Sequence, residues 1–325
     1  MPTAYATYFD SGYLSRGLAL IESLREHGDA SPVWIMALDD QVPALVAAAG
    51  LPDVTVIGVE AIEEEVPGLS ALKGERTRME YYFTTTPLLI AYVMRHSPAG
   101  TDVAYLDADL VFTADPALVW EALGDGSVGI IEHRYPPRLA RRLAKYGRYN
   151  VGWVGFRDDD RGRTVLDWWG EQTLAWCGDT PTNGKYADQG YLDEFPTRFD
   201  GVTVIPDLGM DAAPWNSARW TWRAEGDTVT VDGEPLVFFH MHALRRVGRW
   251  WMTAQLQYGA PAGRVLRERV YTPYVRRLEA WEARIPVPAR PAKRGVGLRG
   301  IAFRAVQRAL HLVGIVTGNA VRAHG

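Results

Sequence analysis

The first sixty residues contain three strand-like segments separated by helix-like segments, and this alternation constrains the fold more than any other feature. Residues 4–9, 33–38 and 54–59 are short apolar or aromatic runs of the kind that form buried strands. Between them, apolar side chains recur at helical spacing over residues 14–24, and residues 42–49 predict a second helix. Strands that alternate with helices predict a parallel sheet joined by crossover helices.

The alternation continues along the rest of the chain. The polar residues 63–78 predict a surface loop. The whole pattern predicts an α/β protein with a Rossmann-like, mostly parallel sheet flanked by helices. We predict further strands at residues 103–106, 128–131, 149–156 and 202–205, helices over 82–94 and 162–176, a loop leading into a helix over 184–195, and a hairpin pairing residues 228–232 with 236–240 around Asp232-Gly233.

The composition is that of a globular protein in a reducing compartment. Of the 325 residues, 47% are apolar and 23% are charged, which is sufficient for a sizeable core. The single cysteine, Cys177, excludes an intramolecular disulfide and a cysteine-based zinc cage. The first residues lack the basic and apolar regions of a secretion signal, so we expect a cytoplasmic protein.

The C-terminal region differs from the rest of the chain in charge. Residues 283–325 carry eight of the 35 Lys and Arg and no acidic residue, whereas the preceding residues carry 27 basic and 39 acidic side chains. We predict a main domain at residues 1–284, a proline-rich linker at 285–294 and a basic amphipathic helical tail at 295–325. Such a tail would either make a peripheral contact with an anionic membrane or pack on its own body or a partner subunit, as in a homodimer.

Asp107 and Asp109 are the strongest functional signal. They follow the predicted strand 103–106, and open parallel sheets bind ligands beyond the carboxyl ends of their strands. Alternate residues of an extended segment point the same way, so the two carboxylates would repel each other unless a cation compensated. Mg²⁺ or Mn²⁺ suits oxygen ligands of this kind and would bridge the diphosphate of a donor. A D-x-D pair on its own also fits an exposed acidic turn.

His240 and His242 lie on one face of a second candidate strand, with Met241 on the opposite face. Either histidine would complete the metal shell, and an imidazole ligand favours Mn²⁺ over Mg²⁺. The sequence does not choose between the two histidines. The alternative is a partly buried pair held by backbone hydrogen bonds.

Asn150, Asp188 and Gln189 are candidates for contacts with a sugar. Asn150 opens an Asn-Val-Gly sequence on a predicted strand, and Asp188-Gln189 lies where a loop leads into a helix. A carboxylate beside an amide can hydrogen-bond sugar hydroxyls and face a developing oxocarbenium ion. A helix-capping role for Asp188 is the alternative.

Arg76, Arg78 and Arg246 are candidates for phosphate contacts, because a guanidinium group offers paired donors to a phosphate. Each of them also fits a solvated surface charge. Several tryptophans could stack on sugar rings, although most large aromatic side chains belong to the core.

These motifs together resemble the retaining glycosyltransferases of the GT-A fold, in particular glycosyltransferase family 8, the glycogenin and galactosyltransferase-like group. The resemblance spans roughly residues 4–250 and depends on the order and spacing of the motifs. It rests on the early segment from Tyr8 to Tyr13, on Tyr105-Leu-Asp-Ala-Asp109, on Asn150-Val-Gly, on Ala187-Asp-Gln-Gly-Tyr-Leu192, and on His240 and His242.

The resemblance implies a function in which a sugar moves from a nucleotide diphosphate sugar, UDP by family analogy, to a glycan, lipid-linked or other hydroxyl acceptor, as in polysaccharide biosynthesis, with retention of configuration. It implies that Tyr8 and Asp107 contact the donor nucleotide, and that Asp109 and a late histidine bind Mn²⁺. Asp188 and Gln189 would then lie near the anomeric carbon, with Asn150 on the opposite wall. The late family motif continues from His through Gly to Lys-Pro-Trp, whereas this chain reads His240-Met-His-Ala-Leu-Arg-Arg246. The basic residue that grips the diphosphate is therefore left open.

Two other classes of protein fit part of the sequence. Asp107-Ala-Asp-Leu-Val111 matches the D-x-D-x-[TV] motif of haloacid dehalogenase-type phosphatases and mutases, in which Asp107 would attack phosphate. That motif normally opens its fold, whereas three strand-helix units precede it here. A non-catalytic carbohydrate-binding protein would keep the aromatic residues but would not need Asp107, Asp109 and Asp188 together.

Overall fold

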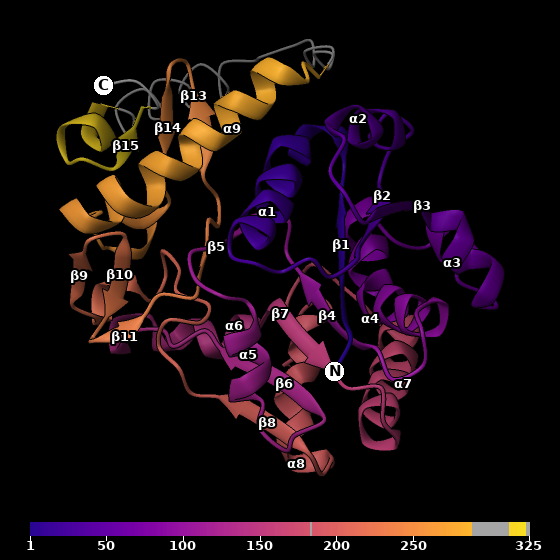
Figure 1. The fold of residues 1–325 in the computed structure, drawn as a ribbon. Coiled ribbons are helices and arrows are strands. Elements are labelled where there is room, and N and C mark those ends of the chain that lie inside the picture. Colours follow the sequence, from indigo (N-terminus) through magenta and orange to yellow (C-terminus); the bar gives the residue numbers. More distant parts are fainter. Residues whose placement is uncertain (183, 288–311, 323–325) are drawn as a thin grey trace, which may run out of the picture.

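The computed structural model describes residues 1–182, 184–287 and 312–322, and its centre is one seven-stranded sheet (Figure 1). The strands of this sheet are β1 (Thr3–Phe9), β2 (Val33–Ala37), β3 (Val54–Gly58), β4 (Asp102–Leu106), β6 (Val128–Glu132), β7 (Tyr149–Phe156) and β8 (Val202–Ile205). Their order across the sheet is β3-β2-β1-β4-β7-β6-β8, and β7 is the strand that runs antiparallel to its neighbours. The prediction of a mostly parallel sheet flanked by helices is confirmed.

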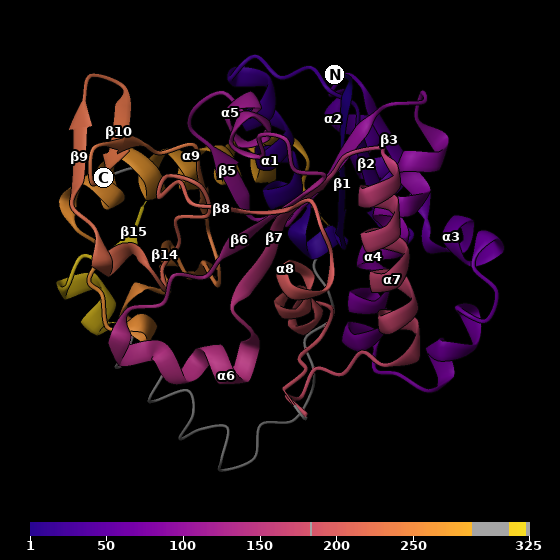
Figure 2. The same cartoon turned by 90° about the horizontal axis from the view of Figure 1, so that it is seen from below.

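Helices cover both faces of this sheet (Figures 1 and 2). The α-helices are α1 (Leu14–Glu26), α2 (Val42–Ala49), α3 (Val59–Glu65), α4 (Arg78–His96), α5 (Ala117–Ala122), α6 (Leu143–Tyr146), α7 (Asp160–Ala175), α8 (Phe195–Arg198) and α9 (Thr272–Arg284). Short 3-10 helices are η1 (Ser11–Tyr13), η2 (Ser70–Gly74), η3 (Pro137–Arg142), η4 (Gln189–Glu194), η5 (Ser217–Arg219) and η6 (Gln255–Tyr258), and a π-helical turn, η7 (Leu266–Tyr271), leads into α9. Helices α4 and α7 pack together, as do α1 and α9.

Strand β1 shows how the sequence supports a core on each face. Its side chains alternate, so Tyr5 and Phe9 pack into the core that contains α1 and α9, whereas Ala4 and Ala6 face the core that contains α4 and α7. All four are at most 2% exposed. The strand is buried on both sides, as expected for a parallel strand between two helical layers.

The prediction of a surface loop over residues 63–78 is wrong in part. This segment contains the end of α3 and the short helix η2. It leads into α4, where the side chain of Thr77 accepts a hydrogen bond from the Glu80 backbone N–H and the Glu80 side chain accepts one from the Thr77 N–H. This capping box satisfies two backbone donors that a helix start would otherwise leave unpaired.

The predicted hairpin between residues 228–232 and 236–240 is right about its turn at Asp232-Gly233 and its first strand, but wrong about its second strand. Strand β10 (Thr228–Val231) pairs with β9 (Trp222–Glu225) and, across this turn, with the two-residue strand β11 (Glu234–Pro235), and the Leu236 N–H donates to the Val229 carbonyl at 2.8 Å. The chain then crosses the molecule, and β12 (Phe238–His240) pairs antiparallel with β5 (Leu110–Phe112). Burial of Phe238 against Phe112, with ring centroids 5.2 Å apart, stabilises this pairing.

The C-terminal part of the described chain packs on the body. Strand β14 (Trp250–Met252) pairs with β13 (Arg245–Val247) and with β15 (Ala320–Val321). Residues 288–311, which include most of the predicted linker and of the predicted amphipathic tail, lie outside the described residues. Among the helices that are described, none combines the length and the apolar character needed to cross a bilayer.

Candidate metal centre and adjoining cavity

Asp107 and Asp109 lie where β4 ends and β5 begins, at the carboxyl edge of the central sheet. The Asp107 N–H donates to the carbonyl of Gly152 on the neighbouring strand β7, at 2.9 Å. The hydroxyl of Tyr105, two residues earlier, donates to the Asp107 carboxylate at 3.0 Å. The sheet therefore fixes both the backbone and the side chain of Asp107.

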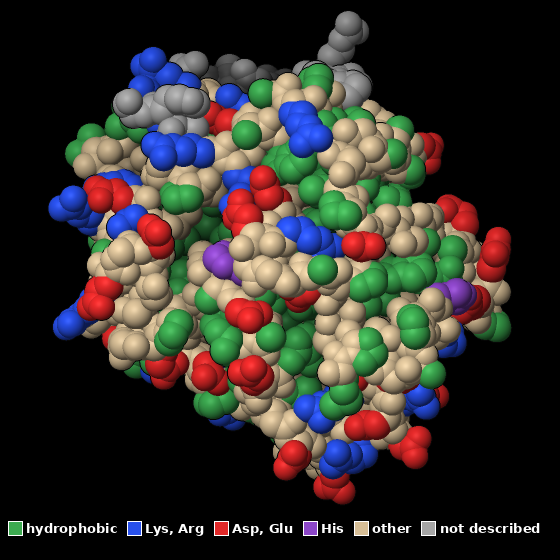
Figure 3. Space-filling model, in the orientation of Figure 1, with side chains coloured by type: hydrophobic (Ala, Val, Ile, Leu, Met, Phe, Trp, Pro, Cys, Tyr) green, Lys and Arg blue, Asp and Glu red, His purple; other side chains and the backbone are tan. Residues whose placement is uncertain are grey.

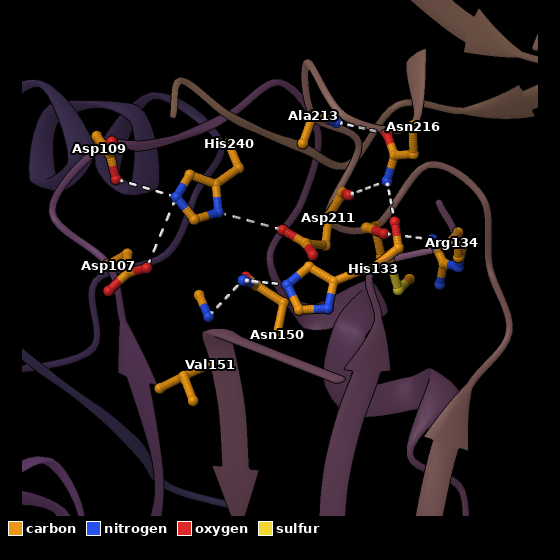
Figure 4. A network of polar contacts seen from close by, with 12 residues as sticks. Asp107, Asp109, His133, Arg134, Asn150, Val151, Asp211, Ala213, Asn216 and His240 are labelled. Carbon is orange, nitrogen blue, oxygen red and sulfur yellow. Dashed lines mark hydrogen bonds and ion pairs between the residues drawn. The ribbon is translucent and has the colours of Figure 1, made fainter. Parts of the chain in front are cut away.

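His240 reaches this acidic pair because β12 pairs with β5 (Figure 4). The pairing continues beyond β12, since the Met241 N–H donates to the Asp109 carbonyl at 2.9 Å. The His240 Nε2 atom lies 3.2 Å from an Asp109 carboxylate oxygen and 3.6 Å from an Asp107 oxygen. Among the described residues, Asp107, Asp109 and His240 form the group whose side-chain atoms are placed to share one metal ion, all within 4.8 Å of one another.

The spacing of these three side chains fits a small divalent cation. Adjacent ligands of an octahedral ion, each about 2.1 Å from the metal, lie about 3 Å apart, which is close to the 3.2 and 3.6 Å separations found here. The side chain of His240 is 4% exposed and those of Asp109 and Asp107 are 14% and 35% exposed. The imidazole is therefore a rigid, buried ligand, while the carboxylates border an open side where a substrate can complete the shell.

Asp211, which the sequence analysis did not single out, supports the buried side of His240. One carboxylate oxygen of Asp211 lies 3.4 Å from His240 Nδ1, and the Asp211 side chain is 1% exposed (Figure 4). A carboxylate at one imidazole nitrogen orients the ring and directs the other nitrogen at a metal. Asp211 follows no recognisable motif and has a positive φ of 59°, so only the folded chain reveals its role.

The charges of this group are strongly coupled. Burial lowers the affinity of His240 for a proton, but the carboxylates of Asp109, Asp211 and Asp107 more than compensate, and the pKa of His240 is raised well above its usual value. Burial and the nearby Asp109 raise the pKa of Asp107 to about 6, against the opposing effect of His240. Without a metal, the imidazolium is thus the cation that balances the acidic pair. A divalent ion would replace this proton.

His242 does not join the group. Its ring packs against Trp215 and Tyr258, with centroids 5.3 and 6.1 Å away, and burial together with the His240 charge lowers its pKa to about 4. The structure therefore brings His240, and not His242, to the acidic pair.

Asn150, Asp188 and Gln189 lie together beside Asp107, Asp109 and His240, which we call the metal group. The Asn150 amide donates to the Gln189 side-chain oxygen at 3.2 Å. Asp188 is 4% exposed, and its burial and the proximity of Asp107 raise its pKa to about 7, although Thr86 donates a hydrogen bond to it. Asp188 precedes η4 without capping it through its side chain, so the capping alternative is not what the structure shows.

These side chains line a cavity of about 340 Å³. Aromatic residues form much of its wall, and they come from β1 and from helices and loops that lie far apart in the sequence. The lining residues are Tyr8, Phe83, Asp107, His133, Tyr135, Arg142, Tyr146, Asn150, Val151, Tyr186, Ala187, Asp188, Gln189, Trp215, His240, His242 and Tyr258.

The candidate phosphate-binding arginines lie elsewhere. The guanidinium of Arg76 donates to the backbone carbonyls of Thr173 and Leu174 at the end of α7. Arg246 on β13 forms an ion pair with Glu282 at 2.6 Å. Arg78 lies nearer the site, where it donates to the Tyr82 hydroxyl, and the Tyr82 ring lies tilted against Tyr8, with centroids 6.4 Å apart.

Arg16 on α1 is a basic side chain that the sequence analysis missed. Burial alone would raise the pKa of Asp109, but the charge of His240, and to a smaller extent that of Arg16, lowers it below its usual value. The Arg16 guanidinium lies 4.6 Å from the centre of the Tyr13 ring and donates to the Leu244 carbonyl at 2.8 Å. Arg16 sits within an ordinary amphipathic helix, so no local pattern marks it.

Known proteins similar to this chain show its family and its fold. No model of a known protein family matches the sequence. The uncharacterized protein YfnF of Bacillus subtilis (strain 168) is 33% identical over 258 residues, which cover 76% of this chain and 83% of YfnF. The uncharacterized protein YfnD of the same organism is 26% identical over 279 residues, which cover 85% of this chain and 89% of YfnD.

Among solved structures, the galactosyltransferase LgtC, in complex with donor and acceptor sugar analogues, superposes with a TM-score of 0.53 and 14% sequence identity. The alignment covers 90% of this chain and 98% of LgtC. This likeness confirms the predicted GT-A fold. Membership of glycosyltransferase family 8 stays a prediction.

Proposed function

Because this chain belongs to the family of Bacillus subtilis YfnF and has the GT-A fold, we propose that it is a metal-dependent glycosyltransferase that uses a nucleotide diphosphate sugar as donor. The observation that carries the proposal is the convergence of Asp107, Asp109 and His240 at the carboxyl edge of the sheet, next to a cavity lined by aromatic and amide side chains. The acceptor is a hydroxyl group of a glycan or lipid-linked glycan.

Asp107, Asp109 and His240 would hold the metal ion, and the imidazole favours Mn²⁺. Bound there, the ion would supply positive charge to the donor diphosphate. Asp211 would keep the His240 ring in place. Both carboxylates must be ionised and His240 must be neutral at Nε2 for this arrangement.

The donor nucleotide, UDP by family analogy, would lie along Tyr8, Asp107 and Arg78. Tyr8 and Asp107 both line the cavity, and Arg78 lies over the ring of Tyr82 beside Tyr8. We assign the diphosphate to Arg16, because its charge acts on Asp109. Arg76 is bonded to carbonyls at the end of α7, and Arg246 is paired with Glu282.

The reacting sugar would lie between Asn150 and the Asp188-Gln189 pair, with retention of configuration. Asn150 and Gln189 share a hydrogen bond, so a sugar hydroxyl can join an existing amide network. Asp188, buried and able to ionise near neutral pH, is placed to stabilise positive charge on the sugar, or to act as a transient nucleophile. The GT-A fold does not accommodate the haloacid dehalogenase alternative, whose motif belongs on the first strand.

Incubation with a panel of nucleotide sugars and Mn²⁺ tests this function. We expect nucleotide release from at least one donor, and we expect it to be abolished by chelation and by Asp109→Ala. Asp125→Ala, at an exposed site away from the centre, serves as the matched control and should retain activity. Nucleotide release that survives both chelation and Asp109→Ala would contradict metal dependence. The absence of release from every donor would favour the carbohydrate-binding alternative.

A further inference from the structure

One of the residues that line the cavity, Arg142, belongs to a segment rich in positive charge. The segment from η3 through α6 to Arg148 contains Arg138, Arg141, Arg142, Lys145 and Arg148 and no acidic residue. Arg148 forms an ion pair with Glu132 at 2.7 Å. Among the described residues, the other four have no carboxylate partner, although Arg138 donates to the Tyr258 carbonyl at 2.7 Å. Such a cluster is unexpected in a chain whose net charge is -4.

Figure 2 shows where this segment lies in the molecule. In Figure 2, η3 and α6 form the helical segment at the bottom, on the opposite side from the N-terminus. On the face drawn in Figure 3, basic and acidic side chains are interspersed and neither sign dominates. That face lies on the opposite side of the molecule from η3 and α6, which Figure 2 shows.

Arg142 connects this cluster to the cavity. It is half-buried and lines the cavity, and its guanidinium lies 4.8 Å from the centre of the Tyr258 ring and 5.9 Å from that of Tyr146. The two rings hold the charged group at the cavity wall without neutralising it. The guanidinium thus keeps its donors available for an anion.

Two series of contacts run from Arg142 to the residues proposed to hold the metal and the sugar. In one direction, Tyr258 lies next to His242 and Trp215, which pack against His240. In the other direction, the Tyr146 carbonyl accepts a hydrogen bond from Gln189, which in turn contacts Asn150. Arg142 therefore contacts Tyr258 and Tyr146, which in turn contact residues beside the proposed metal and sugar positions.

We propose that the acceptor is an anionic glycan, and that Arg142, supported by Arg141 and Lys145, binds its phosphate or carboxylate group. A guanidinium binds both groups through paired hydrogen bonds. Tyr146, Tyr186 and Tyr258 offer flat faces for the sugar rings next to that charge. The inference rests on the proposed function, because it assigns one end of the cavity to the acceptor of that reaction.

Binding of simple probes tests the proposal. Methyl glycosides, sugar 1-phosphates and hexuronic acids of gluco, galacto and manno configuration are titrated into the protein with saturating UDP and Mn²⁺, so that anions cannot occupy the donor site. We expect at least one anionic probe to bind tenfold or more tightly than its neutral counterpart. The preference should weaken with added NaCl, because charge pairing at a partly exposed site is screened. The phosphate and carboxylate arms identify which group is recognised.

Arg142→Gln, alone and with Lys145→Gln, should remove this preference. The matched control is Arg264→Gln, at an exposed arginine paired with Glu268. In transfer assays, Arg142→Gln should raise the acceptor KM at least tenfold more than the donor KM, and unchanged thermal unfolding excludes misfolding as the cause.

Several results would overturn the proposal. These are equal binding of neutral and anionic probes, an anion preference that persists in the double variant, and a larger effect of Arg142→Gln on the donor KM than on the acceptor KM. A fourth result comes from flotation with phosphatidylglycerol vesicles. If the double variant floats less than the wild type but keeps its preference for anionic glycans, the cluster binds a membrane instead. Donor-dependent nucleotide release, measured on the same protein without acceptor, separates these outcomes from a failure of the proposed function.

Discussion

At the scale of single residues, Asp188 illustrates how a site residue can reduce stability. Its side chain is withdrawn from water, so its pKa rises from 3.8 to about 7 in the folded protein. Between these pH values the folded protein holds a proton that the unfolded chain has lost. The contribution of Asp188 to the free energy of unfolding therefore falls as pH rises from about 4 to about 7.

We predict that Asp188→Asn stabilises the protein at pH 8. The full pKa shift corresponds to at most about 4 kcal/mol, and we expect a gain of about 1 to 3 kcal/mol because an amide keeps part of the hydrogen bonding. The advantage of the variant should shrink as pH is lowered to 4. Urea unfolding in the presence of EDTA measures it. An advantage that is independent of pH, or that grows on acidification, would contradict the assignment.

Asp211 gives a second prediction at this scale. Because its carboxylate lies at His240 Nδ1, Asp211→Ala should weaken Mn²⁺ binding about 10- to 100-fold, as loss of such an orienting partner does in other metal sites. Asp211→Asn, which retains an acceptor oxygen, should have a smaller effect. Calorimetric titration of Mn²⁺ measures both, with Asp227→Ala at an exposed position as the control. Unchanged affinity in Asp211→Ala would show that His240 needs no support.

The sequence was most informative about residues within short motifs. Asp107, Asp109, Asn150, Asp188 and Gln189 are adjacent to strands or turns that local patterns reveal, and the fold brings these residues close to one another. The residues that it missed, among them Asp211 and Arg16, depend on contacts across the chain. The arginine assignments were weakest, because a long flexible side chain can reach many partners from one backbone position.

At the scale of elements, the site depends on two pairings: β12 with β5, and β7 with β4. The second of these places Gly152 directly beneath His240. A Cβ atom added to Gly152 would lie 2.8 Å from His240 Nδ1 and would collide with the Asn150 side-chain oxygen. The absence of a side chain at this position therefore lets the histidine ring approach β7.

We predict that Gly152→Ala displaces His240 and weakens Mn²⁺ binding at least about tenfold, the lower end of the effect of disturbing a metal's supporting residues. Overpacking should also cost about 1 to 3 kcal/mol of stability. Gly263→Ala is the matched control, since an added Cβ there meets no atom within 4 Å. Calorimetry and urea unfolding of both variants provide the measurement. Equal Mn²⁺ affinity in the wild type and Gly152→Ala would mean that the ring is not confined by β7.

Element prediction succeeded where periodicity is local and failed where pairing is distant. The strands of the central sheet follow from short apolar runs separated by helices. The residues 236–240 looked like the second arm of a hairpin, because they follow a turn and a β-prone segment. Leu236 does bond back to Val229, but residues 238–240 pair with β5, more than a hundred residues earlier, where Phe238 is buried. No local signal distinguishes these two partners.

At the scale of the whole molecule, the GT-A fold places Asp107, Asp109 and His240 at one edge of the sheet, and residues of η3 and α6, Arg142 and Tyr146, line the same cavity. The proposals above assign the donor to the acidic pair and the acceptor to Arg142. The cytoplasmic location, the peripheral membrane contact of the tail and the homodimer stay predictions. The amphipathic pattern behind the tail prediction falls largely on residues 288–311, outside the described chain.

The central claim is that Asp107, Asp109 and His240 hold the metal that binds the donor diphosphate. Anomalous diffraction from crystals grown with Mn²⁺ and UDP tests it most directly. We predict one strong manganese peak bonded to His240 Nε2, to both carboxylates and to diphosphate oxygens of UDP. A fully occupied manganese site elsewhere, or UDP bound in the cavity with no manganese at this group, would contradict it.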